Sequence, residues 1–285
     1  MMPRSVPVAQ LPHRRFLPLL YRKILGLTRK HGLFTLARFH DRFFGGMQRV
    51  DIPGGGSLII PDDSHYFGFL AGVHEQHVEA LIRDSVAPGD VCIDVGANIG
   101  YFSMMMAKAA GMRGRVIAFE PVPDTFDVLK QNATLAAEEG GRLEAHQAAV
   151  SAQAGELIIE RQEHSTLNQV RQAHGGDAGE RVPCVELAGF LDSVGITGQV
   201  ALLKVDVEGH EMSVVQGALP VLASGRVKRM ILEVTPGEEA GRIEGLLTNC
   251  GARIHCWIGD RWQEGGWSNL GYRTDVLIDF PSRED

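Results

Sequence analysis

Apolar residues follow two different spacings along the chain from about residue 74 onward. Short runs rich in Val, Ile, Leu and Ala predict buried strands, and stretches with apolar residues three or four positions apart predict helices between them. The expected strands cover residues 91–95, 115–119, 143–149, 156–160, 200–205, 230–234, 253–258 and 274–280. The expected helices cover residues 74–86, 100–110, 124–137, 211–222 and 238–247.

This alternation of strands and helices predicts an α/β fold with a doubly wound, mostly parallel Rossmann-like sheet covered by helices on both faces. The last two strands are joined by a Gly- and Trp-rich loop and are expected to be antiparallel. The polar, glycine-bearing residues 171–181 have the composition of a surface loop or lid.

The N-terminal part of the chain has a different pattern. Residues 11–44 mix apolar and basic side chains in short stretches of helical spacing, and a glycine-rich stretch precedes a short expected strand at residues 57–61. We therefore divide the chain into an N-terminal, partly helical segment (1–70) and a main domain (71–285). A basic amphipathic segment can lie on an anionic membrane surface, but packing on the acidic body of the protein or a homodimer contact is favoured.

Charge is distributed unevenly between these two parts. The chain has a net charge of -7, yet residues 1–50 contain ten Lys or Arg and the single acid Asp41. The acidic main domain argues against an enzyme that acts generally on nucleic acids. With no apolar run near the roughly 18 residues of a membrane span, no secretory signal pattern and four cysteines without metal-ligand spacing, the sequence predicts a cytoplasmic protein with reduced thiols.

The first expected strand runs into a glycine-bearing turn that indicates a nucleoside site. Residues 91–103 read VCIDVGANIGYFS, and the next strand ends at Glu120. In such a unit the turn brings backbone close to the ligand, and the acid accepts hydrogen bonds from ribose hydroxyls. The order Asp94-x-Gly96-x-Asn98-x-Gly100 departs from the G-x-G-x-x-G of a diphosphate-binding turn. A strand-end carboxylate suits a cationic amino-acid ligand better, so S-adenosylmethionine is preferred over a purely structural turn.

Acids end three of the expected strands, at the edge where open α/β sheets bind their ligands. They are Asp94, Glu120 and Asp206, the last within the run KVDVEGHE. Glu208 and Glu211 also have a structural explanation, because an acid at a helix N-terminus stabilises the helix by about 0.3–1 kcal/mol. That explanation is weaker for Asp206, which ends the strand and faces the expected cofactor.

These motifs together resemble the FkbM family of S-adenosylmethionine-dependent methyltransferases. The resemblance rests on LLKVDVEGHEMSVVQGA, IDVGANIGYFS and AFEPVPDTFDVLKQN, and it extends from about residue 73 to residue 280. It implies a seven-stranded sheet with an antiparallel last strand, and methyl transfer to a hydroxyl of a sugar, glycan or polyketide-like small molecule. The first 50 residues lie outside it.

The resemblance also implies roles for single residues. The methionine end of the cofactor would be lined by Asp94, Gly96, Asn98 and Gly100, with Ser103 in the following helix. Glu120 would hold the ribose hydroxyls. The adenine would lie beside Pro121, Val122, Ala148 and Ala149. Asp206 would face the cofactor ammonium or the acceptor.

An alcohol is a poor nucleophile and benefits from a positioned base. We hypothesise that His210 or Asp206 takes the acceptor proton, with Glu208 and Glu211 orienting that group, although a lone histidine at a helix start is often only a cap or surface residue. The rival is a Mg²⁺ ion held by Asp206 and Glu233, which is not favoured because the sequence shows no dedicated ligand cluster.

Acceptor contacts and other function classes remain open from the sequence alone. The polar residues Ser165, Thr166 and Asn168 could touch the acceptor, or could form an ordinary loop. A non-catalytic nucleoside-binding or scaffold protein would keep the pocket and tolerate loss of Asp206. A nicotinamide-dependent oxidoreductase should show G-x-G-x-x-G, and methylation of RNA is supported only by the basic N-terminal segment.

Overall fold

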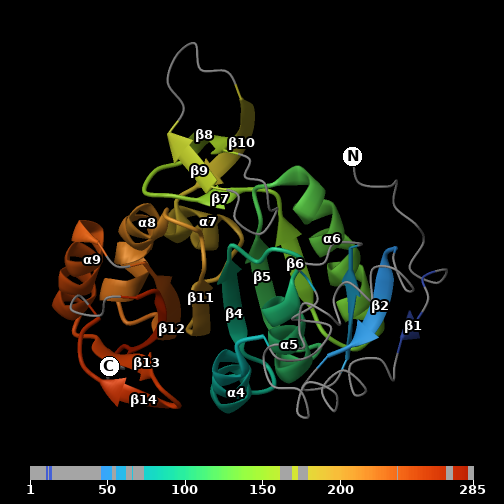
Figure 1. Cartoon of the computed structure of the whole chain (residues 1–285), viewed down its shortest axis with the longest axis horizontal. Helices are drawn as coiled ribbons and strands as arrows, with labels where there is room; N and C mark the ends of the chain where they lie inside the picture. Colours follow the sequence, from blue (N-terminus) through green and yellow to red (C-terminus); the bar gives the residue numbers. More distant parts are fainter. Residues whose placement is uncertain are drawn as a thin grey trace.

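The computed structural model describes residues 11, 13–14, 46–52, 56–61, 66, 74–160, 169–172, 179–235, 237–267 and 272–281. Its centre is a sheet with the strand order β14-β13-β15-β12-β11-β4-β5-β6 (Figure 1). The strands are β4 (Val91–Val95), β5 (Arg115–Phe119), β6 (Leu143–His146), β11 (Val200–Val205), β12 (Val227–Val234), β13 (Arg253–Ile258), β14 (Arg261–Glu264) and β15 (Thr274–Asp279).

The direction of the strands agrees with the expected fold, with one addition. The strands from β6 to β12 are parallel, and β15 pairs antiparallel with both β12 and β13. The sheet has eight strands rather than the seven expected, because part of the Gly- and Trp-rich loop forms β14 and pairs with β13.

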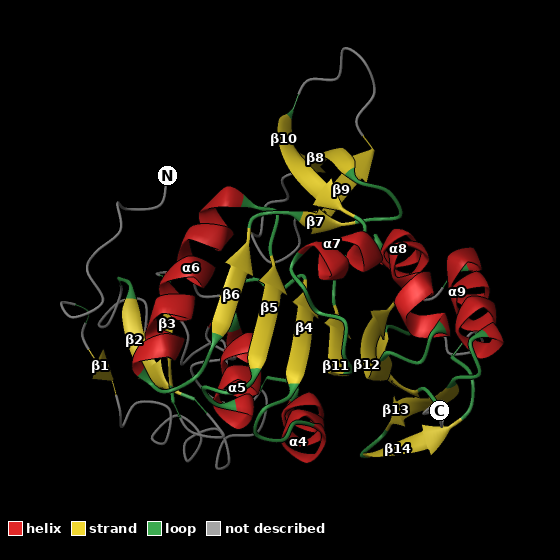
Figure 2. Ribbon diagram, turned by 180° about the vertical axis from the view of Figure 1, so that it is seen from behind, coloured by secondary structure: helices red, strands yellow, loops and turns green. Residues whose placement is uncertain are grey.

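Helices cover both faces of this sheet (Figure 2). One face carries α4 (Gln76–Ser85), α5 (Tyr101–Ala110) and α6 (Pro123–Glu138), and the other carries α7 (Leu187–Ser193), α8 (Glu211–Ala223) and α9 (Glu238–Asn249). Within β4, Cys92 belongs to the first core, whereas Ile93 and Val95 belong to the second. This alternation follows from the two-residue period of a strand, and it places Asp94 on the side of α5.

A smaller sheet projects from the edge where the parallel strands end (Figure 1). It has the order β7-β10-β8-β9, formed by β7 (Ala149–Val150), β8 (Gly155–Glu160), β9 (Gln169–Gln172) and β10 (Glu180–Val185). The strand expected at 143–149 is confirmed at 143–146 as β6, but it is wrong beyond His146, because the chain leaves the main sheet there and β7 pairs with β10. The expected lid begins in β9 and ends in β10, and residues 173–178 of it lie outside the described residues.

A third sheet joins the N-terminal segment to the main domain. It consists of β1 (His13–Arg14), β2 (Gln48–Asp51) and β3 (Ser57–Ile60), and β3 confirms the short strand expected there. Leu58 and Ile59 are fully buried in the same core as α4, α5 and α6. The helical pattern of residues 11–44 lies outside the described residues except for residues 11 and 13–14, of which 13–14 form β1, and the division at residue 70 stays a prediction.

Two chain-wide properties complete the description. The four cysteines are free. Within the described ranges, no helix combines the length and apolar character needed to cross a bilayer.

Asn132 of α6 joins the N-terminal sheet to the turn between β4 and α5. Its Oδ1 accepts the Ile59 N–H at 2.7 Å, and its Nδ2 donates to the Ile59 carbonyl at 3.0 Å and to the Ile99 carbonyl at 2.7 Å. We expect Asn132→Ala to lower the free energy of unfolding by about 2–4 kcal/mol, because it leaves buried backbone groups unpaired. Urea denaturation measures this, and Thr134→Ala on the exposed side of the same helix should stay within about 0.5 kcal/mol of the parent.

Candidate active site

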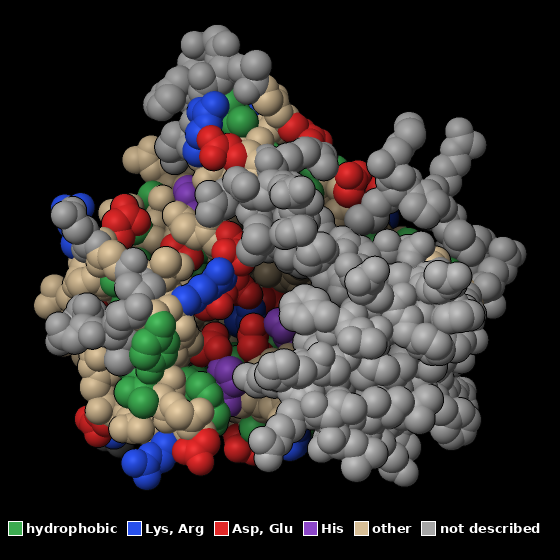
Figure 3. Space-filling view, viewed as in Figure 1, with side chains coloured by type: hydrophobic (Ala, Val, Ile, Leu, Met, Phe, Trp, Pro, Cys, Tyr) green, Lys and Arg blue, Asp and Glu red, His purple; other side chains and the backbone are tan. Residues whose placement is uncertain are grey.

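A cavity of about 350 Å³ opens where β4, β5, β11 and β12 end. Figure 3 shows it as a hollow whose floor is formed by acidic side chains. Most of the residues predicted from the sequence line it: Asp94, Gly96, Asn98, Glu120, Pro121, Val122, Ala148, Ala149, Asp206, Glu208, His210 and Glu233. The fold thus brings together three motifs that lie far apart along the chain.

The turn after β4 is held tightly against its neighbours. Gly96 has φ +77°, and a Cβ there would lie 1.8 Å from the Asp206 carbonyl oxygen, so the position requires glycine. The N–H groups of Gly96 and Ala97 both donate to the Phe119 carbonyl, at 3.0 and 2.9 Å. Asn98 has φ 52° and its side-chain oxygen accepts the Ile99 N–H at 2.8 Å. The turn is therefore fixed before any ligand binds.

Two residues that the sequence predicted to bind the cofactor lie behind the cavity wall rather than in it. Gly100, at the start of α5, has φ +90°, and a Cβ there would lie 2.7 Å from Leu129 Cδ1. Ser103 is fully buried, and its hydroxyl donates to Asp94 Oδ2 at 2.5 Å. Neither residue is among those that line the cavity. Any contribution to ligand binding from these two therefore acts through the turn and through Asp94.

Glu120 is held as a hydrogen-bond acceptor at the end of β5. Its Oε1 accepts the Val122 N–H at 2.9 Å, and its Oε2 accepts the Asn98 N–H at 3.0 Å. Burial raises the pKa of this carboxyl to about 7, although both N–H groups oppose the shift. Each oxygen keeps a free lone pair, so the geometry fits a ligand that offers two neighbouring hydroxyls, as a ribose does.

Asp94 supplies a second indication that a ligand belongs here. The residue is 1% exposed and lines the cavity, and its Oδ1 has no hydrogen-bond partner among the described atoms. Burial raises the pKa of this carboxyl. An unpaired buried acceptor is costly, and an ammonium or another donor group of a ligand would satisfy it. The acids and the turn therefore fit S-adenosylmethionine.

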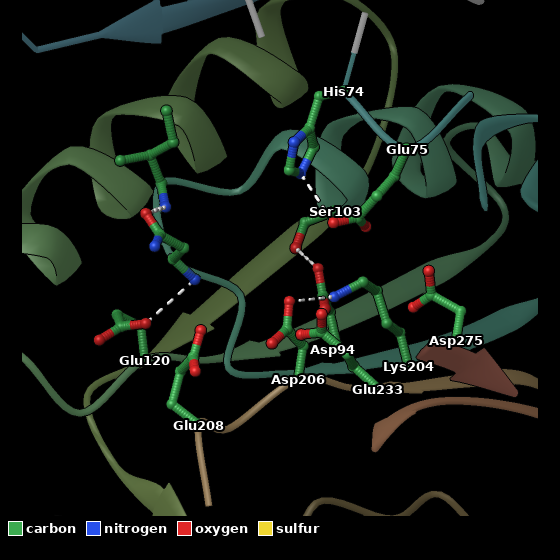
Figure 4. A network of polar contacts seen from close by, with 12 residues as sticks. His74, Glu75, Asp94, Ser103, Glu120, Lys204, Asp206, Glu208, Glu233 and Asp275 are labelled. Carbon is green, nitrogen blue, oxygen red and sulfur yellow. Dashed lines mark hydrogen bonds and ion pairs between the residues drawn. The ribbon is translucent and has the colours of Figure 1, made fainter. Parts of the chain in front are cut away.

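Arg273, just before β15, binds the acidic cluster at the other side of the cavity. Its Nη1 lies 2.8 Å from Glu208 Oε2, and its Nη2 contacts Glu233 and lies 3.7 Å from Asp206 Oδ1. Lys204 Nζ lies 3.1 Å from Asp206 Oδ2 (Figure 4). Each of the three carboxylates thus has a cationic partner within the protein.

The same three carboxylates could in principle hold a divalent cation. Oxygen atoms of Asp206, Glu208 and Glu233 lie within 4.8 Å of one another, and oxygen ligands suit Mg²⁺. A metal would have to displace the Arg273 guanidinium. The cluster therefore includes the Asp206–Glu233 pair considered from the sequence and adds Glu208 to it.

Asp206 and Glu233 titrate as a pair that shares one proton. Burial and the neighbouring Asp206 raise the pKa of Glu233 to about 9. Burial opposes ionisation of Asp206 as well, but Lys204 and the hydrogen bond with Glu233 lower its pKa to about 2. Near pH 7 the pair therefore holds one proton, and Lys204 favours the ionised form of Asp206.

His210 lies at the start of α8 and is 8% exposed. Its Nε2 lies 3.1 Å from the hydroxyl oxygen of the buried Ser151. Burial lowers the pKa of His210, so the ring is neutral near pH 7. The next residue, Glu211, accepts the Gly209 N–H at 2.8 Å, which supports its structural explanation at the helix N-terminus.

Backbone strain is concentrated around this cavity. Among the described residues, the non-glycine residues with positive φ are Glu75 (33°), Asn98 (52°) and Glu208 (50°), and all three line the cavity. Such conformations cost about 1–3 kcal/mol each and persist where surrounding contacts enforce them. They are typical of functional sites.

Several residues of the wall were not expected from the sequence. They are contributed by α5, by β9 and by segments outside the recognised motifs: His74, Glu75, Tyr101, Phe102, Val170 and Arg273. No motif marks His74, Glu75 or Arg273, and only the fold brings them to the strand ends. The suggested acceptor residues Ser165, Thr166 and Asn168 lie outside the described residues.

Comparisons with known proteins agree with this site. Residues 94–254 match the model of the Methyltransferase FkbM domain. The chain is 30% identical over 177 residues to the hexuronic acid methyltransferase AglP of Haloferax volcanii. This alignment covers 61% of this chain and 68% of that protein. It is 31% identical over 198 residues to the 31-O-demethyl-FK506 methyltransferase FkbM of Streptomyces tacrolimicus, with coverage of 59% and 74%. A solved S-adenosylmethionine-dependent O-methyltransferase from Thermotoga maritima is 15% identical, covers 85% of this chain and 79% of its own, and has a TM-score of 0.45.

Proposed function

The chain belongs to the FkbM methyltransferase family, and we propose that it methylates a hydroxyl group of a sugar, glycan or polyketide-like small molecule. As a member of this family it is an S-adenosylmethionine-dependent methyltransferase. The acceptor class is supported by two relatives, one named for hexuronic acid and the other for an O-methyl position of FK506. The observation that carries the proposal is the single cavity that joins Glu120, Asp94 and the neutral His210.

S-adenosylmethionine, when bound, supplies a methyl group on a positively charged sulfur. The protein's part is to hold the two reactants in line, which can supply most of the rate enhancement. Glu120 would accept hydrogen bonds from the ribose hydroxyls, and the adenine would be held by Pro121, Val122, Ala148 and Ala149. Asp94 and the turn at Gly96 and Asn98 would hold the methionine end, and Gly100 and Ser103 support them from the side away from the cavity.

His210 takes the acceptor proton in this proposal. It is neutral near pH 7 and lines the cavity, whereas Asp206 has a pKa of about 2 and is a much weaker base. Asp206 and Glu208, fixed by Lys204 and Arg273, orient the acceptor by accepting hydrogen bonds from its hydroxyls. A positioned base contributes typically about 10²–10⁴-fold to such a reaction.

Methyl transfer from radiolabelled S-adenosylmethionine into fractionated cell extract tests the acceptor class. We expect label in the small-molecule or glycan fraction, and a His210→Gln variant should incorporate it about 100-fold more slowly or worse while binding S-adenosylhomocysteine as before. His255→Gln on β13, outside the cavity wall, is the matched control. Excess EDTA should leave the rate unchanged, because Arg273 and Lys204 already occupy the acidic cluster as its cationic partners.

Other outcomes of this assay point elsewhere. Label confined to the RNA or protein fraction would contradict the acceptor class. Absence of label in all fractions, with cofactor binding intact, would favour the non-catalytic binding protein. Loss of turnover in EDTA that Mg²⁺ restores would favour the metal mechanism. A peripheral membrane contact or homodimer through the N-terminal segment would be a separate property, and cytoplasmic localisation remains our expectation.

A further inference from the structure

Glu75 occupies an unusual position at the entrance of α4. It is the residue before the helix, with φ 33° and ψ 54°, and its side chain makes no capping hydrogen bond to the helix. Glutamate has no special tolerance for this left-handed conformation. The side chain lines the cavity instead, together with Asp94 and Lys204 (Figure 4). The strained backbone therefore directs a carboxyl group into the ligand site rather than into the helix cap.

The sheet order determines which part of the cofactor reaches Glu75. Strand β4 lies between β5 and β11, and neighbouring strands are about 4.8 Å apart. In the proposed arrangement, the ribose of the cofactor contacts Glu120 at the end of β5. The rest of the cofactor then crosses the turn after β4, so its amino-acid end points toward β11. Lys204 and Asp206 lie there, and α4 packs against β11 and α5.

At this end of the cavity, one oxygen of Asp94 is left without a hydrogen-bond donor among the described residues. This oxygen is the buried Oδ1, and the nearby Lys204 pairs with Asp206. An ammonium group has three N–H donors, and the one unpaired oxygen of Asp94 cannot accept hydrogen bonds from all three. A second carboxylate facing the same space completes such a site.

We propose that Glu75 binds the ammonium group of the methionine moiety of S-adenosylmethionine, as the second carboxylate beside Asp94. This rests on the cofactor-binding role of the cavity given above. Glu75 is then a cofactor-binding residue contributed by a segment outside the glycine turn and outside KVDVEGHE. Its carboxylate accepts a charge-assisted hydrogen bond, which is roughly twice as strong as a neutral one.

His74 positions this carboxylate. Its Nε2 lies 3.3 Å from Glu75 Oε1, and its ring packs against Tyr101 and Phe102, with centroids 5.9 and 5.7 Å apart. Burial, together with the nearby Lys204, lowers the pKa of His74 to about 4. The ring is therefore neutral near pH 7, and in the tautomer protonated at Nε2 it donates to Glu75 without neutralising its charge.

The charge of Glu75 also makes binding depend on pH. Burial raises its pKa to about 7, with Asp275 and Asp206 adding to the shift and with Lys204 and His77 opposing it. An ammonium beside the carboxylate lowers that pKa, so binding releases protons near pH 7. Affinity for a ligand with an ammonium should accordingly rise from pH 6 to pH 8.

Isothermal titration calorimetry with two ligands tests the proposal. S-adenosylhomocysteine has the amino-acid end, and 5′-methylthioadenosine lacks it but keeps the ribose contact with Glu120. We expect Glu75→Gln to weaken S-adenosylhomocysteine by about 10- to 100-fold and to change 5′-methylthioadenosine less than about twofold. At pH 7, titrations in buffers of different ionisation enthalpy should show more proton release with S-adenosylhomocysteine than with 5′-methylthioadenosine. Glu75→Gln should reduce this difference.

Two further variants keep the result interpretable. Glu75→Gly retains the left-handed backbone without strain and should lose the same selectivity, while Asp84→Asn removes an exposed acid from the same helix and should change neither ligand. Equal weakening of both ligands, or unchanged affinity with slower methyl transfer, would overturn the proposal, the latter by assigning Glu75 to the acceptor. Failure of the unaltered protein to bind either ligand would instead overturn the cofactor assignment, and this proposal with it.

Discussion

Replacing Lys204 with methionine should lower the free energy of unfolding by about 3–5 kcal/mol at pH 7, the range for breaking a buried ion pair. The Lys204 side chain is 4% exposed, and its Nζ lies 3.1 Å from Asp206 Oδ2 and 4.9 Å from the centroid of the Phe102 ring. Burial alone would lower the pKa of Lys204, but Asp206 and Asp94 raise it above its ordinary value. Without the ammonium, these acids would be left without their main compensating charge.

The loss should depend on pH in a definite direction. In the parent protein the ammonium's contribution is fully present at neutral pH, because the raised pKa of Lys204 lies well above it. In the variant, the pKa values of Asp94 and Asp206 should rise, so both acids can fold protonated at low pH. The deficit relative to the parent should therefore shrink between pH 7 and pH 5.

Urea denaturation at both pH values measures this effect. Lys228→Met, an exposed lysine on the neighbouring strand β12, should change stability by less than about 0.5 kcal/mol. A loss below about 1 kcal/mol for Lys204→Met at pH 7 would mean that the acids are compensated by other groups, with Arg273 the first to examine.

Glu120→Ala should weaken binding of both S-adenosylhomocysteine and 5′-methylthioadenosine by about 100-fold or more. Two hydrogen bonds to a charged oxygen are worth about 1.5–3 kcal/mol each. The variant also leaves the N–H groups of Asn98 and Val122 without their carboxylate partner, so the turn loses part of its fixed geometry. Calorimetry with the two ligands measures the effect.

Loss of both ligands distinguishes Glu120 from Glu75, for which only the ligand with an amino-acid end should be affected. Glu138→Ala, which removes an exposed acid at the end of α6, should leave both affinities unchanged. If Glu120→Ala bound 5′-methylthioadenosine as tightly as the parent, the ribose would have to lie elsewhere in the cavity.

The sequence predicted the main sheet well because its strands are local patterns. The bounds expected for β4, β5, β11 and β13 are those observed, since each is a run of strand-forming residues limited by turns. It did not predict β7, β10 or β14. Strands β7 and β10 depend on pairing with each other across the chain, as between Cys184 and Ala149, and residue type alone does not reveal such a pairing. Strand β14 pairs with the preceding strand β13, within a stretch whose Gly and Trp content indicated a loop.

The residues of the candidate site also divide into those that the sequence predicted and those that it did not. Asp94, Glu120 and Asp206 lie on motifs whose spacing is visible in one sequence, and all three line the cavity. Glu75 and Arg273 come from segments without a motif. Arg273 enters the site because β15 runs antiparallel beside β12, and its contact with Glu208 and Glu233 joins residues 65 and 40 positions away.

The attachment of the N-terminal sheet has a practical consequence for defining the smallest active fragment. The family match begins at residue 94, and a fragment cut there would lack β2, β3 and α4 altogether. Even a cut just after β3 would expose the apolar side of α6 and leave Asn132 without Ile59, the residue it joins to the Ile99 turn. Expression fragments, domain fusions and proteolytic trimming should therefore preserve the chain from upstream of Gln48. Among the described residues, those that line the cavity begin some 26 positions later, at His74.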